Sequence, residues 1–259
     1  MKNGTDVRRS LEPQIQAISN AWRILGRMGL IDTIFNHISV VAADSRGDPY
    51  MMMNSYHHLP EELYPDLVSV FPLRRYTPSE ADSLGVNPDG LQLHVLMHEA
   101  RMRPGAIIHT HSVNAVAVGC SEQGLLPLSQ TAMELVGEIE MIEYTGAFRS
   151  QPLNDQLRKL ARNGGIALLR NHGSLVVADS ISEAVYVTHY LEDACRIQVV
   201  TLSQGAAITL PDPRAVEESY RVLLADRTGA AEQLFAALSR QLRPSTSAYS
   251  VSTSSVGNP

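Results

Sequence analysis

The sequence predicts an α/β domain in which short apolar strands alternate with amphipathic helices. The chain has 259 residues, a length that fits one large domain. Hydrophobic residues make up 44% of it, which is enough to form a substantial core. Short apolar runs, such as 166–169, separate longer segments in which apolar residues recur every three or four positions. We expect a single domain over residues 1–243 and a flexible serine-rich tail over residues 244–259.

A helix and a β-hairpin are expected to open the chain. Apolar residues recur at three- and four-residue spacing over residues 11–29, which predicts an amphipathic helix. Residues 35–42 and 50–54 are largely apolar and flank a polar turn, a pattern typical of a hairpin. Residues 55–85 contain several prolines and show no clean period. We therefore expect them to be irregular, with one short helix near residues 60–63.

The chain from residue 87 onward is expected to alternate between helices and strands. Asn87-Pro88-Asp89 predicts a helix start, because proline suits the first turn and an acid suits the positive end of a helix. That helix should run to about Arg103. The further strands that we expect lie near residues 106–108, 139–142, 166–169 and 176–178. The further helices that we expect span residues 112–119, 154–162, 181–203, 216–224 and 230–242.

The composition excludes several classes of partner. Basic residues number 21 and acidic residues 27, and no basic cluster resembles a site for nucleic acid. No apolar run reaches membrane-spanning length, and the N-terminus lacks the apolar core of a signal peptide. Cys120 and Cys195 stand in apolar stretches, so we expect two reduced, packed thiols. These features predict a cytoplasmic protein with a small-molecule substrate.

Three histidines stand where apolar runs end. His109 and His111 are two residues apart at the end of a predicted strand, so their side chains should share a face. His172 follows a second apolar run. Two strands of one sheet could bring these three imidazoles to one point. Three neutral imidazoles suit a catalytic divalent metal that keeps an open position for substrate or water.

Six motifs follow one another in a characteristic order. They are Asn36-His37-Ile38-Ser39-Val40, residues 86–94, residues 106–112, residues 124–130, residues 143–146 and Arg170-Asn171-His172-Gly173. Their order and spacing resemble the class II aldolase and adducin family over roughly residues 12–250. The resemblance implies a three-layer α/β/α sandwich around a mainly antiparallel central sheet. It also implies one divalent metal ion (zinc, manganese or iron) on His109, His111 and His172, and a homo-oligomer, commonly a tetramer.

Two departures from the family pattern bear on the reaction. The sugar-phosphate aldolases of the family carry an acid four residues before the histidine matched by His94, and this position is Gly90. Their phosphate-binding loop is replaced by Ile34-Phe35-Asn36-His37, which offers apolar bulk and an imidazole. Both departures argue against a phosphosugar aldolase. The sequence is closer to the adducin-like branch of the family.

The function expected from this resemblance is that of a metal-dependent carbon–carbon lyase, of aldolase or decarboxylase type. Its substrate would be a non-phosphorylated carbonyl compound or hydroxy acid that reacts through a metal-stabilised enolate. His94 and Tyr144 are the expected catalytic residues, with His37 and a metal-bound water as other candidates for moving the proton. Asn36, His37 and Gly90 are expected to bind substrate. His98, on the same helix face as His94, is expected to pack on the sheet and donate to a carbonyl.

Two alternatives stay open on the sequence. The first is a non-heme Fe(II) oxygenase acting on an aromatic or keto-acid substrate, since three histidines can hold iron and leave room for O₂. The second is a non-catalytic adducin-like interaction module that keeps the fold without the chemistry. Retention of all three histidines argues against the module.

Overall fold

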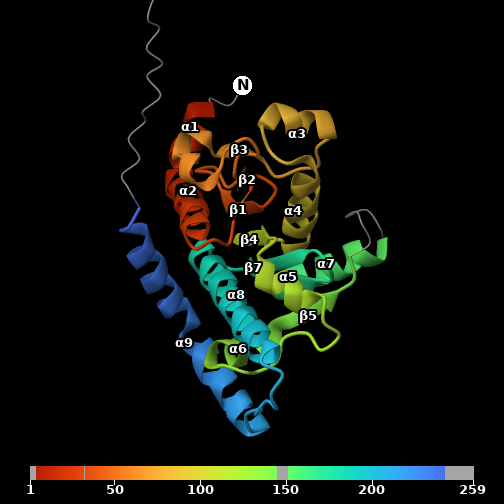
Figure 1. Ribbon diagram of the computed structural model, residues 1–259. Helices are drawn as coiled ribbons and strands as arrows, with labels where there is room; N and C mark the ends of the chain where they lie inside the picture. The colour runs from red at the N-terminus through yellow and green to blue at the C-terminus, as the bar shows by residue number, and fades with distance from the viewer. Residues whose placement is uncertain (1–3, 32, 145–150, 243–259) are drawn as a thin grey trace, which may run out of the picture.

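A seven-stranded sheet forms the centre of the molecule. The computed structural model describes residues 4–31, 33–144 and 151–242 (Figure 1). The strands are β1 His37–Ala43, β2 Pro49–Met53, β3 Ser69–Pro72, β4 Gly105–Thr110, β5 Ile139–Ile142, β6 Gly165–Leu169 and β7 Gly173–Ala178. Their order across the sheet is β3-β2-β1-β4-β7-β6-β5. Every neighbouring pair is antiparallel except β5 and β6, which are parallel.

Helices cover both faces of this sheet. They are α1 Gly4–Ser10, α2 Glu12–Arg27, α3 Pro78–Leu84, α4 Pro88–Arg101, α5 Val113–Gly119, α6 Gln130–Leu135, α7 Gln151–Asn163, α8 Ile181–Ser203 and α9 Pro213–Ser239. Single 3-10 turns occur at η1 Pro60–Glu62, η2 Pro65–Leu67 and η3 Val136–Glu138. The layers follow from the alternation of strand side chains. Ile108 packs with α2 and α8 on one face, and Ile107 packs with α4 and α7 on the other. This confirms the expected three-layer sandwich.

The segment that carries the prolines is more regular than expected. Pro60, Pro65 and Pro78 each occupy the first turn of a helical element, where a missing N–H costs nothing. Pro72 ends β3, which lies at the edge of the sheet and so tolerates a residue without a ladder donor. Because apolar residues in this segment show no regular spacing, the sequence did not predict β3 and α3. The short helices α1 and α6 were also not expected from the sequence.

The last helix is longer than expected. The two helices predicted over residues 216–224 and 230–242 form one helix, α9, which runs through Gly229. A glycine inside a helix costs only about 1 kcal/mol, so packing can override it. Arg227 supplies such packing, because its buried guanidinium bonds to Glu134 at 3.0 Å and to Glu138 at 2.7 Å. This ion-paired cluster fastens α9 to α6 and η3.

Three smaller expectations can be compared with the structure. Cys195 is buried and free as expected, whereas Cys120 is also free but exposed, so its predicted packing is wrong. Glu192 on α8 accepts hydrogen bonds from the backbone N–H groups of Asn114 and Ala115 at the start of α5. No helix in the described ranges is long and apolar enough to span a bilayer. The predicted boundary at residue 243 and the tail 244–259 lie outside the described residues.

Candidate metal centre

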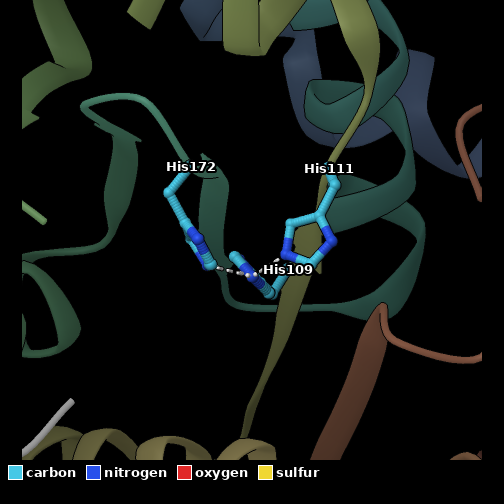
Figure 2. Close-up of side chains that lie close together, drawn as sticks. All are labelled: His109, His111 and His172. Atoms are coloured by element: carbon cyan, nitrogen blue, oxygen red, sulfur yellow. Dashed lines mark hydrogen bonds between the residues drawn. The ribbon is translucent and has the colours of Figure 1, made fainter. Parts of the chain in front are cut away.

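Neighbouring strands bring the three histidines to one edge of the sheet. His109 lies near the end of β4, which pairs with β7, and His111 follows it on the same face. His172 lies in the short turn from β6 to β7, where Asn171 adopts a left-handed conformation with φ of 58°. A side chain at Gly173 would come within 2.4 Å of the Thr110 carbonyl oxygen, so glycine permits the close approach of β7 to β4. Figure 2 shows the imidazoles converging from these two segments.

The three Nε2 atoms face one another. Nε2 of His109 lies 2.9 Å from Nε2 of His111 and 3.2 Å from Nε2 of His172. Nδ1 of His109 lies 2.8 Å from the carbonyl oxygen of Ser174, to which only a protonated nitrogen can donate. That bond places the proton on Nδ1 and leaves the Nε2 lone pair facing the other rings. Tetrahedral ligands at the usual zinc distance would be about 3.3 Å apart, close to the observed spacing. We call these residues the metal triad.

The surroundings keep the imidazoles of His109 and His172 neutral. Burial lowers the pKa of His109 well below its usual value, and charge on His37, His111 and His172 lowers it further. Burial also lowers the pKa of His172 to about 4. Neutral imidazole is the form that coordinates metals. The metal triad can therefore hold a divalent ion.

Asn36 and Tyr144, both predicted site residues, contact the metal triad directly. Asn36 is buried, and its Oδ1 accepts a hydrogen bond of 2.8 Å from the backbone N–H of His111. It thereby fixes the backbone that carries a triad ligand. The ring of Tyr144 stacks on the ring of His172, with centroids 3.9 Å apart. Tyr144 is thus at the centre, and the roles of both residues toward a substrate stay predictions.

The predicted residues His37, His94 and Gly90 lie behind the metal triad. His37 pairs with His109 across β1 and β4, and their rings stack with centroids 4.7 Å apart. His94, on α4, is fully buried and reaches His37 through a contact of 2.9 Å between its Nε2 and Nδ1 of His37. A Cβ at Gly90 would lie 2.6 Å from Cδ2 of His37, so the imidazole occupies the space where a side chain at this position would project.

Ser39 is a site residue that was not predicted from the sequence. Its Oγ lies within hydrogen-bond distance of Nδ1 of His94 and 2.8 Å from Nε2 of His98. His98 therefore bonds to a hydroxyl instead of the expected carbonyl. A signal was present in the sequence, since Ser39 is two residues after His37 and shares its strand face. Helix residues 90, 94 and 98 share the face of α4 that covers it.

Comparisons with known proteins agree with this geometry. Residues 16–199 match the sequence profile of the family described as "Class II Aldolase and Adducin N-terminal domain". A protein of Pseudomonas aeruginosa named "Putative aldolase class 2 protein" is 27% identical over 194 residues, which cover 74% of this chain and 72% of that protein. Alpha-adducin of Rattus norvegicus is 31% identical over 196 residues, which cover 74% of this chain but only 26% of adducin.

Solved structures share the fold. An aldolase II superfamily protein from Pseudomonas syringae superposes with a TM-score of 0.79 at 26% identity, over 90% of this chain and 92% of that one. An L-fuculose 1-phosphate aldolase from Glaciozyma antarctica superposes with a TM-score of 0.70 at 18% identity, over 87% of this chain and 88% of that one. The second likeness shows the fold alone.

Proposed function

Because this chain belongs to the class II aldolase and adducin family, we propose that it is a divalent-metal-dependent carbon–carbon lyase. The proposed substrate is a non-phosphorylated carbonyl compound or hydroxy acid, cleaved by aldol or decarboxylation chemistry. The observation that carries the proposal is the convergence of three imidazole Nε2 atoms in the metal triad. A divalent ion bound there would supply Lewis-acid polarisation of substrate oxygens as negative charge develops on them.

The protein must also move a proton, and Tyr144 is the residue that we propose for this. Its ring stacks on the triad ligand His172, so the phenol belongs to the metal centre. His94 has no exposed surface, and its two ring nitrogens contact His37 and Ser39. Any influence of His94 on a substrate must therefore pass through His37. We accordingly treat His94 as a positioning residue and Tyr144 as the candidate catalytic residue.

Two side chains that are close to site residues in the sequence favour a substrate without phosphate. Arg170, two residues before His172, bonds through Nε to Glu143 at 2.8 Å and through Nη1 to the carbonyl oxygen of Ser121 at 3.0 Å. Its guanidinium is therefore already engaged. Phe35, two residues before His37, is 51% exposed and packs edge-on against Tyr56. Aromatic surface of this kind suits a planar or apolar substrate better than a phosphosugar.

A non-catalytic module is the second candidate, because the similarity to rat alpha-adducin supports it. Such a module would keep the sheet and helices but would not need a bound metal. Metal content separates the two candidates directly. If the protein is incubated with zinc, manganese or iron and then neither retains the ion nor cleaves any substrate, the result would favour the module.

Assembly into a homo-oligomer, in particular a tetramer, is a further part of the proposal. Apolar side chains are exposed on α8 and α9, which pack against each other; Val200 is 57% exposed and Val222 is 50% exposed. Exposed apolar patches commonly mark contacts between chains. Light scattering of the purified protein tests this, and a mass of one chain at micromolar concentration would refute it.

The lyase proposal is tested by turnover with a defined metal. Metal-free protein is loaded separately with zinc, manganese and iron, and aldehyde or CO₂ release is measured from a panel of non-phosphorylated hydroxy acids and aldol adducts. We expect turnover that His172→Ala abolishes and His189→Ala, a change at a half-buried histidine on α8, preserves. We expect fuculose 1-phosphate and rhamnulose 1-phosphate to react more slowly than about 1 per second. Faster cleavage of either, or oxygen uptake by the iron form alone, would contradict the proposal.

A further inference from the structure

Four buried polar side chains extend from the metal triad into the core. His37, His94, Ser39 and His98 contact one another in that order, between β1 and α4, and we call them the buried histidine row. The contacts are 2.9 Å between His37 Nδ1 and His94 Nε2, a short one between His94 Nδ1 and Ser39 Oγ, and 2.8 Å between Ser39 Oγ and His98 Nε2. None of the four side chains is more than 4% exposed. Buried polar groups of this kind need satisfied hydrogen bonds.

Counting protons shows that the row has a direction. All three rings are buried and no carboxylate is among their recorded hydrogen-bond partners, so each ring is neutral and carries one proton. Each contact in the row needs one proton between its two atoms. If Ser39 accepted from both neighbouring histidines, its own hydroxyl proton would lack an acceptor among its recorded contacts. Therefore either every hydrogen bond of the row is donated in the direction of His37, or every one is donated in the direction of His98.

The far end of the row selects between the two directions. Nδ1 of His98 is buried and has no partner among the described residues. If the bonds pointed toward His98, this atom would be an N–H group without an acceptor. If they point toward His37, it is an unused lone pair instead. Buried N–H groups without partners are rarer in proteins than unsatisfied acceptors. The bonds therefore run from His98 through Ser39 and His94 to His37.

This direction determines which nitrogen of His37 carries the proton. Because Nδ1 of His37 accepts from His94, its proton must be on Nε2. The ring is clamped between His109, on which it stacks, and Gly90, whose position leaves no room for a Cβ. A clamped ring holds its N–H in one place without reorganisation, as a preorganised oxyanion donor requires.

We propose that His37 is a fixed hydrogen-bond donor, through Nε2–H, to an oxyanion bound at the metal triad. The buried histidine row positions this donor by fixing its tautomer. The inference rests on the proposed function, because it assumes a ligand with a carboxylate or enolate oxygen at the metal centre. It assigns His94 and His98 to the orientation of His37 and not to contact with the substrate.

The tautomers can be read directly from the metal-free protein. Full-length protein is labelled with ¹⁵N-histidine, and long-range ¹H–¹⁵N spectra report which nitrogen of each ring carries the proton. We expect the proton on Nε2 in His37, His94 and His98. A proton on Nδ1 of His37 overturns the proposal, whatever the activity of the protein.

A matched pair of serine variants tests the role of the row. Ser39→Ala removes the link between His94 and His98, and we expect the rings of His37 and His94 to lose their single tautomer. Ser19→Ala is the control, because Ser19 is equally buried and donates one hydrogen bond of 2.8 Å to the Leu63 carbonyl oxygen, away from the site. Unchanged tautomers in Ser39→Ala would show that the row does not fix His37.

Oxalate binding to the zinc-loaded protein tests the donor itself. The amide nitrogen of glutamine can reach the place of Nε2, whereas that of asparagine reaches only the place of Nδ1. We expect His37→Asn to weaken oxalate binding about 10- to 100-fold and His37→Gln to restore most of it, with zinc affinity unchanged in both. Equal oxalate affinity in wild type and His37→Asn overturns the proposal. Failure of the wild type to bind zinc would instead refute the metal centre, and the tautomer spectra would still decide the row.

Discussion

The metal triad and the buried histidine row use the same residue type in opposite ways. In the triad, three Nε2 atoms point at one another, and the bond from His109 Nδ1 to the Ser174 carbonyl places a proton away from the meeting point. In the row, each contact has a proton between its two atoms, because Ser39 and the rings alternate as donors and acceptors. The two adjacent groups of imidazoles therefore differ, because the triad can accept a cation between its nitrogens and the row cannot.

This difference indicates where a cation belongs. The lone pair of His109 Nε2 faces the Nε2 atoms of His111 and His172, and a cation among these nitrogens could bind all three, whereas each contact in the row already holds a proton. His37 and His109 stack on each other, so the two groups meet at a single pair of rings. A metal should bind on one side of that pair and not on the other. The predictions below test this contrast.

The largest expected effect is the loss of metal from a triad variant. His109→Ala removes one of three ligands, and we expect zinc affinity to fall more than 100-fold, beyond the 10- to 100-fold typical of residues that only support a ligand. His94→Gln, in the buried row, should keep one zinc per chain. Equilibrium dialysis with metal analysis measures both. Equal zinc loss in the two variants would contradict the distinction between the metal triad and the buried histidine row.

A methyl group at position 90 should disturb the row without touching the triad. In Gly90→Ala the new Cβ would lie 2.6 Å from the His37 ring, so the ring or α4 must shift. We expect a loss of about 1–3 kcal/mol in the free energy of unfolding, as for other overpacked cores. Urea denaturation of the metal-free protein measures it.

Gly229→Ala is the matched control for that substitution. Gly229 also lies inside a helix, but a Cβ there would have only the Asp226 carboxylate within 4 Å, at 3.8 Å. Replacing a helical glycine with alanine where there is space stabilises by up to about 1 kcal/mol. The two substitutions should thus change stability in opposite directions, and a neutral Gly90→Ala would mean that His37 is not clamped.

The last expected effect is on acid stability. Burial lowers the pKa of His98 to about 3, against an ordinary value of 6.5, so the unfolded chain takes up a proton that the folded protein excludes. Stability from this group is complete above pH 6.5 and is lost as the pH falls toward 3. Between pH 7 and pH 5 the loss should be about 2 kcal/mol.

His98→Gln should remove that share of the pH dependence. Glutamine does not titrate, so the variant should lose less stability than wild type between pH 7 and pH 5, even if it is less stable at both. Ser19→Ala serves as a buried, non-titrating control and should shift both values equally. Parallel pH profiles for His98→Gln and wild type would show that His98 is not held neutral by its burial.

The sequence predicted the metal triad because strand periodicity is a local property. His109 and His111 share a strand face by their spacing alone, and the apolar run before His172 indicated a second strand end. Family resemblance then supplied the sheet and its layers. The helix boundaries of α4 and α8 also follow from local signals, such as the Asn87 and Ser180 caps.

The parts that the sequence did not predict depend on contacts between distant segments. The join of α9 across Gly229 depends on the bonds of Arg227 to Glu134 and Glu138, about ninety positions earlier. The buried histidine row forms because β1 and α4 face each other, and the spacing of residues within one segment does not predict which segments face each other. Position 90 is an example. The sequence showed that the family's acid is replaced by Gly90, but it did not show that the imidazole of His37 fills the space of the missing side chain.

Anomalous diffraction at the zinc edge, from crystals of the zinc-loaded protein, tests the central contrast most directly. We predict one peak per chain, about 2.0–2.1 Å from Nε2 of His109, His111 and His172. We predict no peak between Nδ1 of His37 and Nε2 of His94, although these nitrogens are as close together as two in the triad. A peak between His37 and His94, or a triad without zinc, would contradict the account.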